Sequence, residues 1–279
     1  MRVASYQIDG RRSWGLVEGD TVSDLAAVLP DCPTVEAAIA RGLGAGMALP
    51  DASRHALSAI RWEQPVSRPE RIICCGLNYR DHVAEASTRG MPDVPSLFLR
   101  TLRSMTAHEG PIVRPHVSDH LDYEGELCVV IGKPGRNLSR ENALDHVFGY
   151  TCFNDGSVRD FQKKYKAVAG KNFPSTGGVG PWIVTPDDMP DPKNLGLRTR
   201  LNGETVQETN TSKMIFDIRE ILATVSVFDE LRPGDLVMTG TPEGVGQGRT
   251  PPLWMKPGDV VEVEIDGIGV LRNTVVQED

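Results

Sequence analysis

The 279-residue chain has no apolar run that approaches the ~20 residues a membrane-spanning helix needs. Its first residues, Met1–Tyr6, enter a strand-like pattern at once, without the hydrophobic core of a signal peptide. Lys/Arg runs are also missing, and a net charge of -8 with a pI near 5.3 argues against a nucleic-acid surface. The five cysteines show no C-x-x-C spacing, so reduced and buried thiols are expected. A cytoplasmic protein that binds neither membrane nor nucleic acid is predicted.

Turn-forming residues divide the chain into strand-like segments with scattered helices. The segment 64–69 contains two prolines and no periodicity, and it is predicted to link two domains. The first, residues 1–65, is a small α+β domain with a β meander over 2–25 and helices over 34–40 and 51–60. The second, residues 66–279, is the larger domain. The expected fold class is mainly β (α+β), a sandwich or roll rather than a doubly wound sheet.

Within the larger domain, strands are predicted where short apolar runs lie between turn residues, and helices where a capping residue precedes a longer segment. The glycine-rich segment 156–182 has few strong patterns and the composition of a functional loop. The main predicted elements are strands over 71–76, 96–99, 121–131, 147–153, 197–201 and 260–265, and helices over 140–146 and 215–224.

One predicted strand carries both a core pattern and several acids. Residues 127–131 are continuously apolar, which is typical of a strand buried on both faces, whereas Asp122, Glu124 and Glu126 alternate and are predicted to point to one side. Carboxylates this close repel one another and are poorly solvated, so a compensating cation is expected. Mg²⁺ and Mn²⁺ prefer such oxygen ligands. The same alternation also fits the wet face of an edge strand, although the apolar run favours a central one.

The predicted metal set is completed by Asp155, so that Glu124, Glu126 and Asp155 would leave about three of six octahedral positions open for water or substrate. An open metal site is a catalytic arrangement, because a fully caged ion could not polarise a carbonyl group.

Two further groups have the residue types of a catalytic site. His82 and Glu85 are three residues apart on a short predicted helix, so Glu85 can orient the imidazole and let His82 take a proton from water. An exposed ion pair has the same spacing. Arg159, Gln162 and Lys171 are donors that suit a developing enolate or oxyanion, or are solvated loop residues.

Five segments, in order, resemble motifs of the fumarylacetoacetate hydrolase family over roughly residues 70–276. Gly76–Glu85 resembles G-x-N-Y-x-x-H-x-x-E, and Asp122–Leu127 resembles D-x-E-x-E-L. Asn154–Gln162 is similar to N-D-x-S-x-R-D-x-Q, Gly170–Phe173 to G-K-x-F, and Thr239–Gly246 to T-G-T-P-x-G-V-G.

The resemblance implies a mixed β-sandwich roll, usually a homodimer, with Mg²⁺ or Mn²⁺ on the three carboxylates. It implies a water-activating His82–Glu85 dyad on a lid that orders when substrate binds, and oxyanion stabilisation by Lys171 and Gln162. Substrate contacts are implied for four residues, Tyr79, Arg100, Arg159 and Thr241, the last at the substrate carboxylate. Two departures leave the substrate's identity open: Arg100 stands where many members have lysine, and Pro174 where many have aspartate.

The predicted function is metal-dependent hydrolysis of a C–C bond in an acylpyruvate or related β-diketo acid, giving pyruvate and a carboxylic acid in aromatic or sugar-acid catabolism. Oxaloacetate-type decarboxylation and hydroxymuconate-type isomerisation need the same site but no attack by water, and both stay open. The alternative of another class is a catalytically silent metal-binding or regulatory protein. The joint presence of His82, Glu85 and Lys171 weighs against it.

Overall fold

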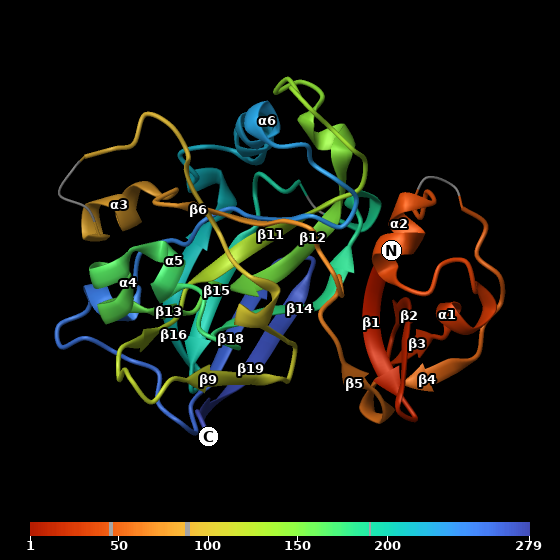
Figure 1. Cartoon of the computed structure of the whole chain (residues 1–279), viewed down its shortest axis with the longest axis horizontal. Helices are drawn as coiled ribbons and strands as arrows, with labels where there is room; N and C mark the ends of the chain where they lie inside the picture. Colours follow the sequence, from red (N-terminus) through yellow and green to blue (C-terminus); the bar gives the residue numbers. More distant parts are fainter. Residues whose placement is uncertain (45–46, 87–89, 190) are drawn as a thin grey trace.

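A computed structural model describes residues 1–44, 47–86, 90–189 and 191–279 of the chain (Figure 1). Strands dominate and the helices are short, which confirms the predicted mainly β class. A 12-stranded sheet and a five-stranded sheet pack on each other, since β11, β12 and β14 of the first contact β15, β18 and β19 of the second. The two sheets therefore form the predicted sandwich.

The larger sheet contains, in spatial order, β4 (Arg54–Ala56), β3 (Thr21–Ser23), β2 (Arg11–Glu18), β1 (Arg2–Ile8), β14 (Gly177–Val184), β12 (Val147–Asn154), β11 (Gly125–Ile131), β17 (Leu236–Met238), β6 (Ile72–Gly76) and β7 (Ser96–Leu99), with β5 (Arg61–Trp62) beside β1 and β8 (Met105–Ala107) beside β14. The smaller sheet contains β16 (Glu204–Asn210), β15 (Gly196–Leu201), β18 (Val260–Ile265), β19 (Gly269–Gln277) and β9 (Pro111–Arg114), while β10 (Leu121–Asp122) pairs with β13 (Ser157–Val158). The α-helices are α1 (Leu25–Val28), α2 (Val35–Ala40), α3 (Arg80–Ala86), α4 (Arg159–Tyr165), α5 (Ala167–Gly170) and α6 (Ile218–Phe228). Single 3₁₀ turns are η1 (Leu57–Ala59), η2 (Leu102–Ser104), η3 (Ala143–His146), η4 (Pro186–Asp188), η5 (Thr211–Lys213) and η6 (Gly246–Gly248).

Strand β11 lies at the centre of the larger sheet, between β12 and β17, and every one of its residues is buried. Leu127 and Val129 join the hydrophobic core shared with the smaller sheet. Cys128 and Val130 point the opposite way, into a second core shared with the N-terminal elements. The continuous apolar run thus reflects a strand covered on both faces, as predicted.

The N-terminal elements gather at one end of the molecule, in red and orange in Figure 1. The predicted meander is confirmed as β1 to β3, and so is the helix capped by Thr34, whose hydroxyl accepts a hydrogen bond from the backbone of Ala37. The predicted helix over 51–60 is wrong: Arg54–Ala56 pairs with β3, and this long-range strand pairing overrides local helical tendency. Strand β1 also pairs with β14, so the sheet runs on past residue 65, where the domain boundary stays a prediction.

The segment 156–182, predicted as a loop, folds instead into β13, α4, α5 and the first part of β14. The helix predicted over 140–146 is only the 3₁₀ turn η3. The helix predicted over 215–224 begins later, at Ile218, because Asp217 accepts a hydrogen bond from the backbone of Glu220 and caps it. Helices as short as α4 and α5, which only Lys166 separates, escape a search for long periodic segments.

None of the helices in the described residues combines the length and apolarity needed to cross a membrane. All five cysteines are buried and unpaired, as predicted.

Asp24 joins β2 and α1 in the N-terminal part of the fold. Its carboxylate is buried, and it accepts hydrogen bonds from Arg11 Nη2 at 2.5 Å, Ser13 Oγ at 2.5 Å and the backbone of Ala27 at 3.3 Å. Burial raises the pKa of Asp24, but Arg11 and Ser13 outweigh it and lower the pKa to about 2. Because the folded pKa lies below the unfolded value, the ionised group stabilises the fold above about pH 4, and this stability is lost as the pH falls toward 2.

We therefore expect Asp24→Asn to lower the free energy of unfolding by about 1–2 kcal/mol at pH 7, a range reduced because Arg11 is half exposed. The difference from wild type should shrink as the pH falls through the window between the two pKa values. Urea denaturation at neutral and acidic pH measures both quantities. Asp20→Asn, in an exposed turn, is the matched control. A difference that stays constant with pH would rule out this ionic contribution.

Candidate active site

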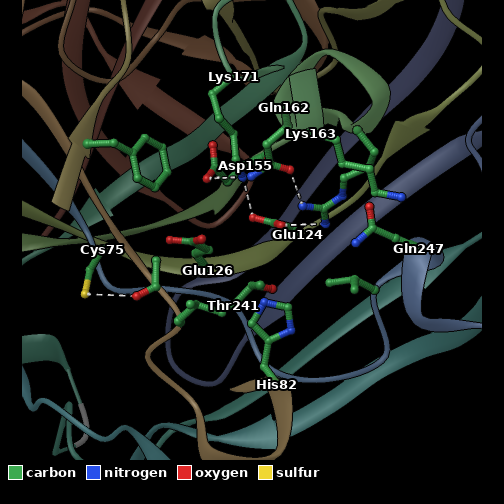
Figure 2. Close-up of a pocket in the computed structure, with 15 residues that line it drawn as sticks. Cys75, His82, Glu124, Glu126, Asp155, Gln162, Lys163, Lys171, Thr241 and Gln247 are labelled. Carbon is green, nitrogen blue, oxygen red and sulfur yellow. Dashed lines mark hydrogen bonds and ion pairs between the residues drawn. The ribbon is translucent and has the colours of Figure 1, made fainter. Parts of the chain in front are cut away.

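A pocket of about 280 Å³ lies where β11 begins, between α3, α4 and the loop that follows β17 (Figure 2). This volume is just below the usual range for ligand pockets, ~300–1,000 Å³, and suits a small acid. Eight of the eleven predicted site residues line it: His82, Glu124, Glu126, Asp155, Arg159, Gln162, Lys171 and Thr241.

The three predicted metal ligands meet in this pocket. Glu124 directly precedes β11 and Glu126 is its second residue, while Asp155 follows the end of β12, the antiparallel neighbour of β11. The register pairs Gly125 with Asn154, and the backbone of Asp155 donates a 2.8 Å hydrogen bond to the carbonyl oxygen of Glu124. One carboxylate oxygen of each acid lies within 4.8 Å of the other two, and all three residues are buried. Sheet pairing alone therefore builds the cluster from acids far apart in sequence.

The ionisation of the cluster is uneven. Burial raises the pKa of Glu126 well above its ordinary value, and the charges of Asp155 and Glu124 raise it further. Among the described residues no cationic group forms an ion pair with Glu126, whose Oε2 accepts one hydrogen bond from the backbone of Gly240 at 2.8 Å. Burial also raises the pKa of Glu124, but Arg159 and Lys171 outweigh that effect and lower it to about 2. The negative charge of Glu124 is thus balanced by two cations, whereas that of Glu126 is balanced by none among the described residues.

Three cations surround these acids. Lys171 Nζ lies 2.6 Å from Glu124 Oε2 and 2.6 Å from Asp155 Oδ2, while Arg159 Nη2 lies 2.6 Å from Glu124 Oε1. Arg100, which does not line the pocket, forms an ion pair with Asp155. Asp122 pairs with Arg159 and is the fourth acid of the cluster. With Glu124, Glu126 and Asp155 it faces the three cations Arg100, Arg159 and Lys171, so the formal charge is -1 when all seven groups are ionised.

The donor set fits a divalent cation. All three candidate ligands are carboxylate oxygens, the preference of Mg²⁺ and Mn²⁺, and the uncompensated acid, Glu126, belongs to the set. A doubly charged ion would change the formal charge of the cluster from -1 to +1, which favours an anionic substrate.

The predicted dyad has the required contact. On α3, His82 Nδ1 lies 3.2 Å from Glu85 Oε2, and the backbone of Gly244 donates to Glu85 Oε1 at 3.2 Å. The side chain of His82 is only 7 % exposed, so this is not a solvated surface pair. Figure 2 shows the imidazole pointing into the pocket from the side opposite Lys171 and Asp155. The second ring nitrogen is thus presented to the reacting space.

The fully buried amide of Asn78, just before α3, joins two loops: Nδ2 donates to the carbonyl oxygens of Phe216 and Thr239, and Oδ1 accepts from the backbone of Phe216. This bridge fixes the start of the segment that carries His82 against the loop that carries Thr241.

Lys171 and Gln162 reach the pocket from a tight pair of short helices. A side chain on Gly170 would lie 2.4 Å from Cβ of Gln162, so only glycine lets α5 pack this closely on α4. Gln162 Oε1 accepts a 2.9 Å hydrogen bond from Arg159 Nη1, which leaves the amide NH₂ of Gln162 for the pocket. The two donors that were predicted to stabilise an oxyanion are therefore on one wall.

Asp122 does not point with Glu124 and Glu126, contrary to the simple alternation. The extended chain is interrupted between β10 and β11, and Asp122 belongs to β10. Its carboxylate accepts from Arg159 Nε at 2.7 Å and from the backbones of Gly246 and Gln247 at 2.7 and 3.1 Å. Asp122 therefore holds Arg159 in place.

Two of the predicted substrate contacts lie outside the pocket lining. Arg100 is buried, and its guanidinium binds Asp155, Ser104 and Thr176, so in this structure it holds a predicted metal ligand. Tyr79 is 1 % exposed and is not among the lining residues. A direct substrate contact by either residue stays a prediction. The remaining departure, Pro174, also lies outside this lining.

Thr241 does line the pocket, but its hydroxyl already donates to the carbonyl oxygen of Gly125 at 3.1 Å and accepts from Gln207 Nε2 at 3.0 Å. Its contribution to substrate binding is thus limited to its remaining acceptor capacity.

Two polar residues of the lining were missed, Lys163 and Gln247. Lys163 is four residues after Arg159 and so lies on the same helix face, a spacing that identifies it once 159–165 is taken as a helix. Gln247 follows the last glycine motif and carries no pattern of its own.

Comparisons with known proteins agree with this geometry. Residues 71–276 match the family described as "Fumarylacetoacetate (FAA) hydrolase C-terminal". The chain is 44 % identical over 231 residues to "Oxaloacetate tautomerase fahd2, mitochondrial" of Xenopus laevis. The aligned region covers 81 % of this chain and 72 % of the relative.

Two solved structures are similar over the whole length of both chains. Fumarylacetoacetate hydrolase from psychrophilic Exiguobacterium antarcticum superposes with a TM-score of 0.88 at 38 % identity. Maleylpyruvate hydrolase from Sphingobium sp. SYK-6, in complex with manganese(II) ion and pyruvate, gives 0.84 at 31 % identity. These findings support a divalent metal at the three carboxylates.

Proposed function

The chain belongs to the fumarylacetoacetate hydrolase family, and from that premise we propose that it is a metal-dependent enzyme that moves a proton at carbon 3 of a 2-oxo acid, with keto–enol tautomerisation of oxaloacetate as its reaction. The observation that carries this proposal is His82, held by Glu85 and facing three clustered carboxylates across the pocket. A base opposite a metal set suits the removal of a proton next to a carbonyl group.

A divalent cation on Glu124, Glu126 and Asp155 supplies a Lewis acid for the 2-oxo group when bound. In our proposal, His82 removes a proton from carbon 3 of the keto form. The C–H electron pair forms the C2=C3 double bond, the π pair of the carbonyl group moves to the 2-oxo oxygen, and this oxygen takes a proton from water to give the enol. The ammonium of Lys171, held by Glu124 and Asp155, places positive charge near the oxygen as it becomes negative.

C–C bond hydrolysis of a β-diketo acid, the reaction predicted from the sequence, is the second candidate. The similarity to a fumarylacetoacetate hydrolase and a maleylpyruvate hydrolase over the full chain favours it. In this reaction His82 takes a proton from water, the water oxygen attacks the 4-carbonyl carbon, and the C3–C4 bond breaks. Its electron pair stays on the pyruvate fragment, which is then protonated at carbon 3.

The two candidates make different products, so assays on three substrates decide between them. With Mg²⁺ or Mn²⁺, we expect kcat/KM for enol–keto conversion of oxaloacetate, followed by ultraviolet absorbance, to exceed that for hydrolysis of fumarylpyruvate and acetylpyruvate by at least about tenfold. Faster release of pyruvate and a carboxylic acid would assign hydrolysis. Pyruvate and CO₂ from oxaloacetate would assign decarboxylation. Metal-stripped protein is the control.

The remaining expectations belong to the same proposal: a homodimer, a cytoplasmic location, a lid that closes over substrate, and Mg²⁺ or Mn²⁺ as the resident ion. Light scattering of the purified protein and metal analysis after purification without chelators test the first and the last.

A further inference from the structure

Helix α4 turns three polar side chains toward the pocket. Arg159, Gln162 and Lys163 occupy positions i, i+3 and i+4, which share one face of a helix, and all three line the cavity. In Figure 2 Lys163 and Gln247 lie on the side of the pocket opposite Cys75 and Glu126. The polar lining therefore continues beyond the carboxylate cluster.

Lys163 differs from the other two cations that line the pocket. Arg159 and Lys171 are buried in ion pairs with Glu124, and Lys171 also pairs with Asp155. Lys163 is exposed. Among the described residues, no carboxylate oxygen lies within 4 Å of its ammonium nitrogen, so Lys163 forms no ion pair there. Its charge is available to a ligand, whereas the others are balanced by the protein.

Gln247 is the second polar group on this side. Its backbone donates to Asp122 Oδ2 at 3.1 Å, and the same carboxylate accepts from Arg159 Nε. Asp122 therefore holds both Gln247 and the start of α4 in place. The side-chain amide of Gln247 lines the pocket and has no hydrogen-bond partner among the residues that the structure describes. It offers a neutral donor on the same side of the pocket as the ammonium group of Lys163.

We propose that Lys163, with Gln247, binds the distal carboxylate of a dicarboxylic 2-oxo acid and selects such acids over monocarboxylic ones. The inference rests on the proposed function in one respect: the 2-oxo acid end of the substrate lies at the three carboxylates. A second carboxylate directed to the opposite side then meets a cation whose charge no protein group neutralises. Oxaloacetate, maleylpyruvate and fumarylpyruvate share this second acid group, whereas acetylpyruvate lacks it.

The test compares Lys163→Met with Lys164→Met. The neighbouring Lys164 is also exposed but lies outside the pocket, its ammonium 4.9 Å from the ring centroid of Tyr165. We expect K163M to lower kcat/KM for oxaloacetate by about 10- to 100-fold, the range for a hydrogen bond to a charged group, and K163R to restore most of it. K164M should stay within about twofold of wild type. Added salt should weaken oxaloacetate binding to wild type more than to K163M.

Binding measurements separate this inference from the choice of reaction. The probes are 3,3-difluorooxaloacetate, a dicarboxylate that cannot enolise, and 2-oxobutanoate, which has a methyl group in place of the distal acid, each titrated calorimetrically into Mn²⁺-loaded protein. K163M should weaken binding of the first by about 10- to 100-fold and of the second by less than about twofold.

Equal weakening of both probes, or of neither, would overturn the assignment of Lys163. If wild type turns over none of the substrates, the proposed function fails, while the difference between the two probes still decides the role of Lys163. The exposure of Lys163 means that K163M keeps the fold, which thermal unfolding verifies.

Discussion

Glutamine in place of Glu126 is expected to give a folded protein that no longer binds a divalent cation with useful affinity. The substitution keeps the shape of the side chain and the oxygen that accepts from the backbone of Gly240. It removes one of three anionic ligands, so the loss of Mn²⁺ affinity should exceed the roughly 10- to 100-fold that follows loss of an outer-shell partner. Turnover should fall with it.

Stability provides the control for this variant. Because burial beside Asp155 and Glu124 raises the pKa of Glu126, a neutral side chain there should leave the metal-free protein at least as stable as wild type. Saturating Mn²⁺, at about 100 times its Kd, should raise the free energy of unfolding of wild type by about 2.7 kcal/mol and that of E126Q by almost nothing. Equal stabilisation of both proteins by Mn²⁺ would remove Glu126 from the metal site.

Glutamine in place of His82 is expected to lower turnover by about 10²- to 10⁴-fold, the usual contribution of a general base. Metal binding should be unchanged, because His82 lies across the pocket from the carboxylates and is not among the clustered ligands. Glu85→Gln should have a smaller effect of the same kind, since Glu85 acts only by holding the imidazole at 3.2 Å.

Steady-state kinetics and Mn²⁺ calorimetry on the same preparations test this separation. His116→Gln, at an exposed histidine remote from the pocket lining, is the matched control and should keep wild-type kcat. Wild-type turnover by H82Q would exclude the dyad from both candidate reactions. Loss of metal binding in H82Q would show instead that the histidine belongs to the metal site.

The metal set was accessible from the sequence because two of its acids are encoded locally. The E-x-E spacing places Glu124 and Glu126 on one side of an extended segment, and the apolar run that follows predicts the buried strand. Asp155 is different: its closeness to Glu124 is set by the antiparallel register of β11 and β12, which no local pattern encodes. The sequence offers Asp155 as a candidate third ligand, and the family motifs strengthen that assignment.

The errors share a physical origin in long-range contacts. Asp122 fits the alternation but is diverted by Arg159 and by the backbone of the loop at Gly246. The contacts of Arg100 are likewise not encoded locally: it is adjacent to a strand that borders the pocket, but its partners Asp155, Ser104 and Thr176 lie in three other segments. Lys163 does not stand out in the sequence because the segment of α4 has the composition of a loop, and the helical spacing from Arg159 becomes visible only in the folded helix.

The ammonium of Lys171, 2.6 Å from an oxygen of Glu124 and of Asp155, has a further consequence for how the enzyme is assembled in a cell. A covalently attached counter-ion already screens two of the three acids, and its pKa is raised although burial opposes this, so it remains charged at neutral pH. Apoprotein can therefore fold and persist before metallation. Removal of the metal ion by a chelator should therefore leave the protein folded, and adding the ion back should refill the site.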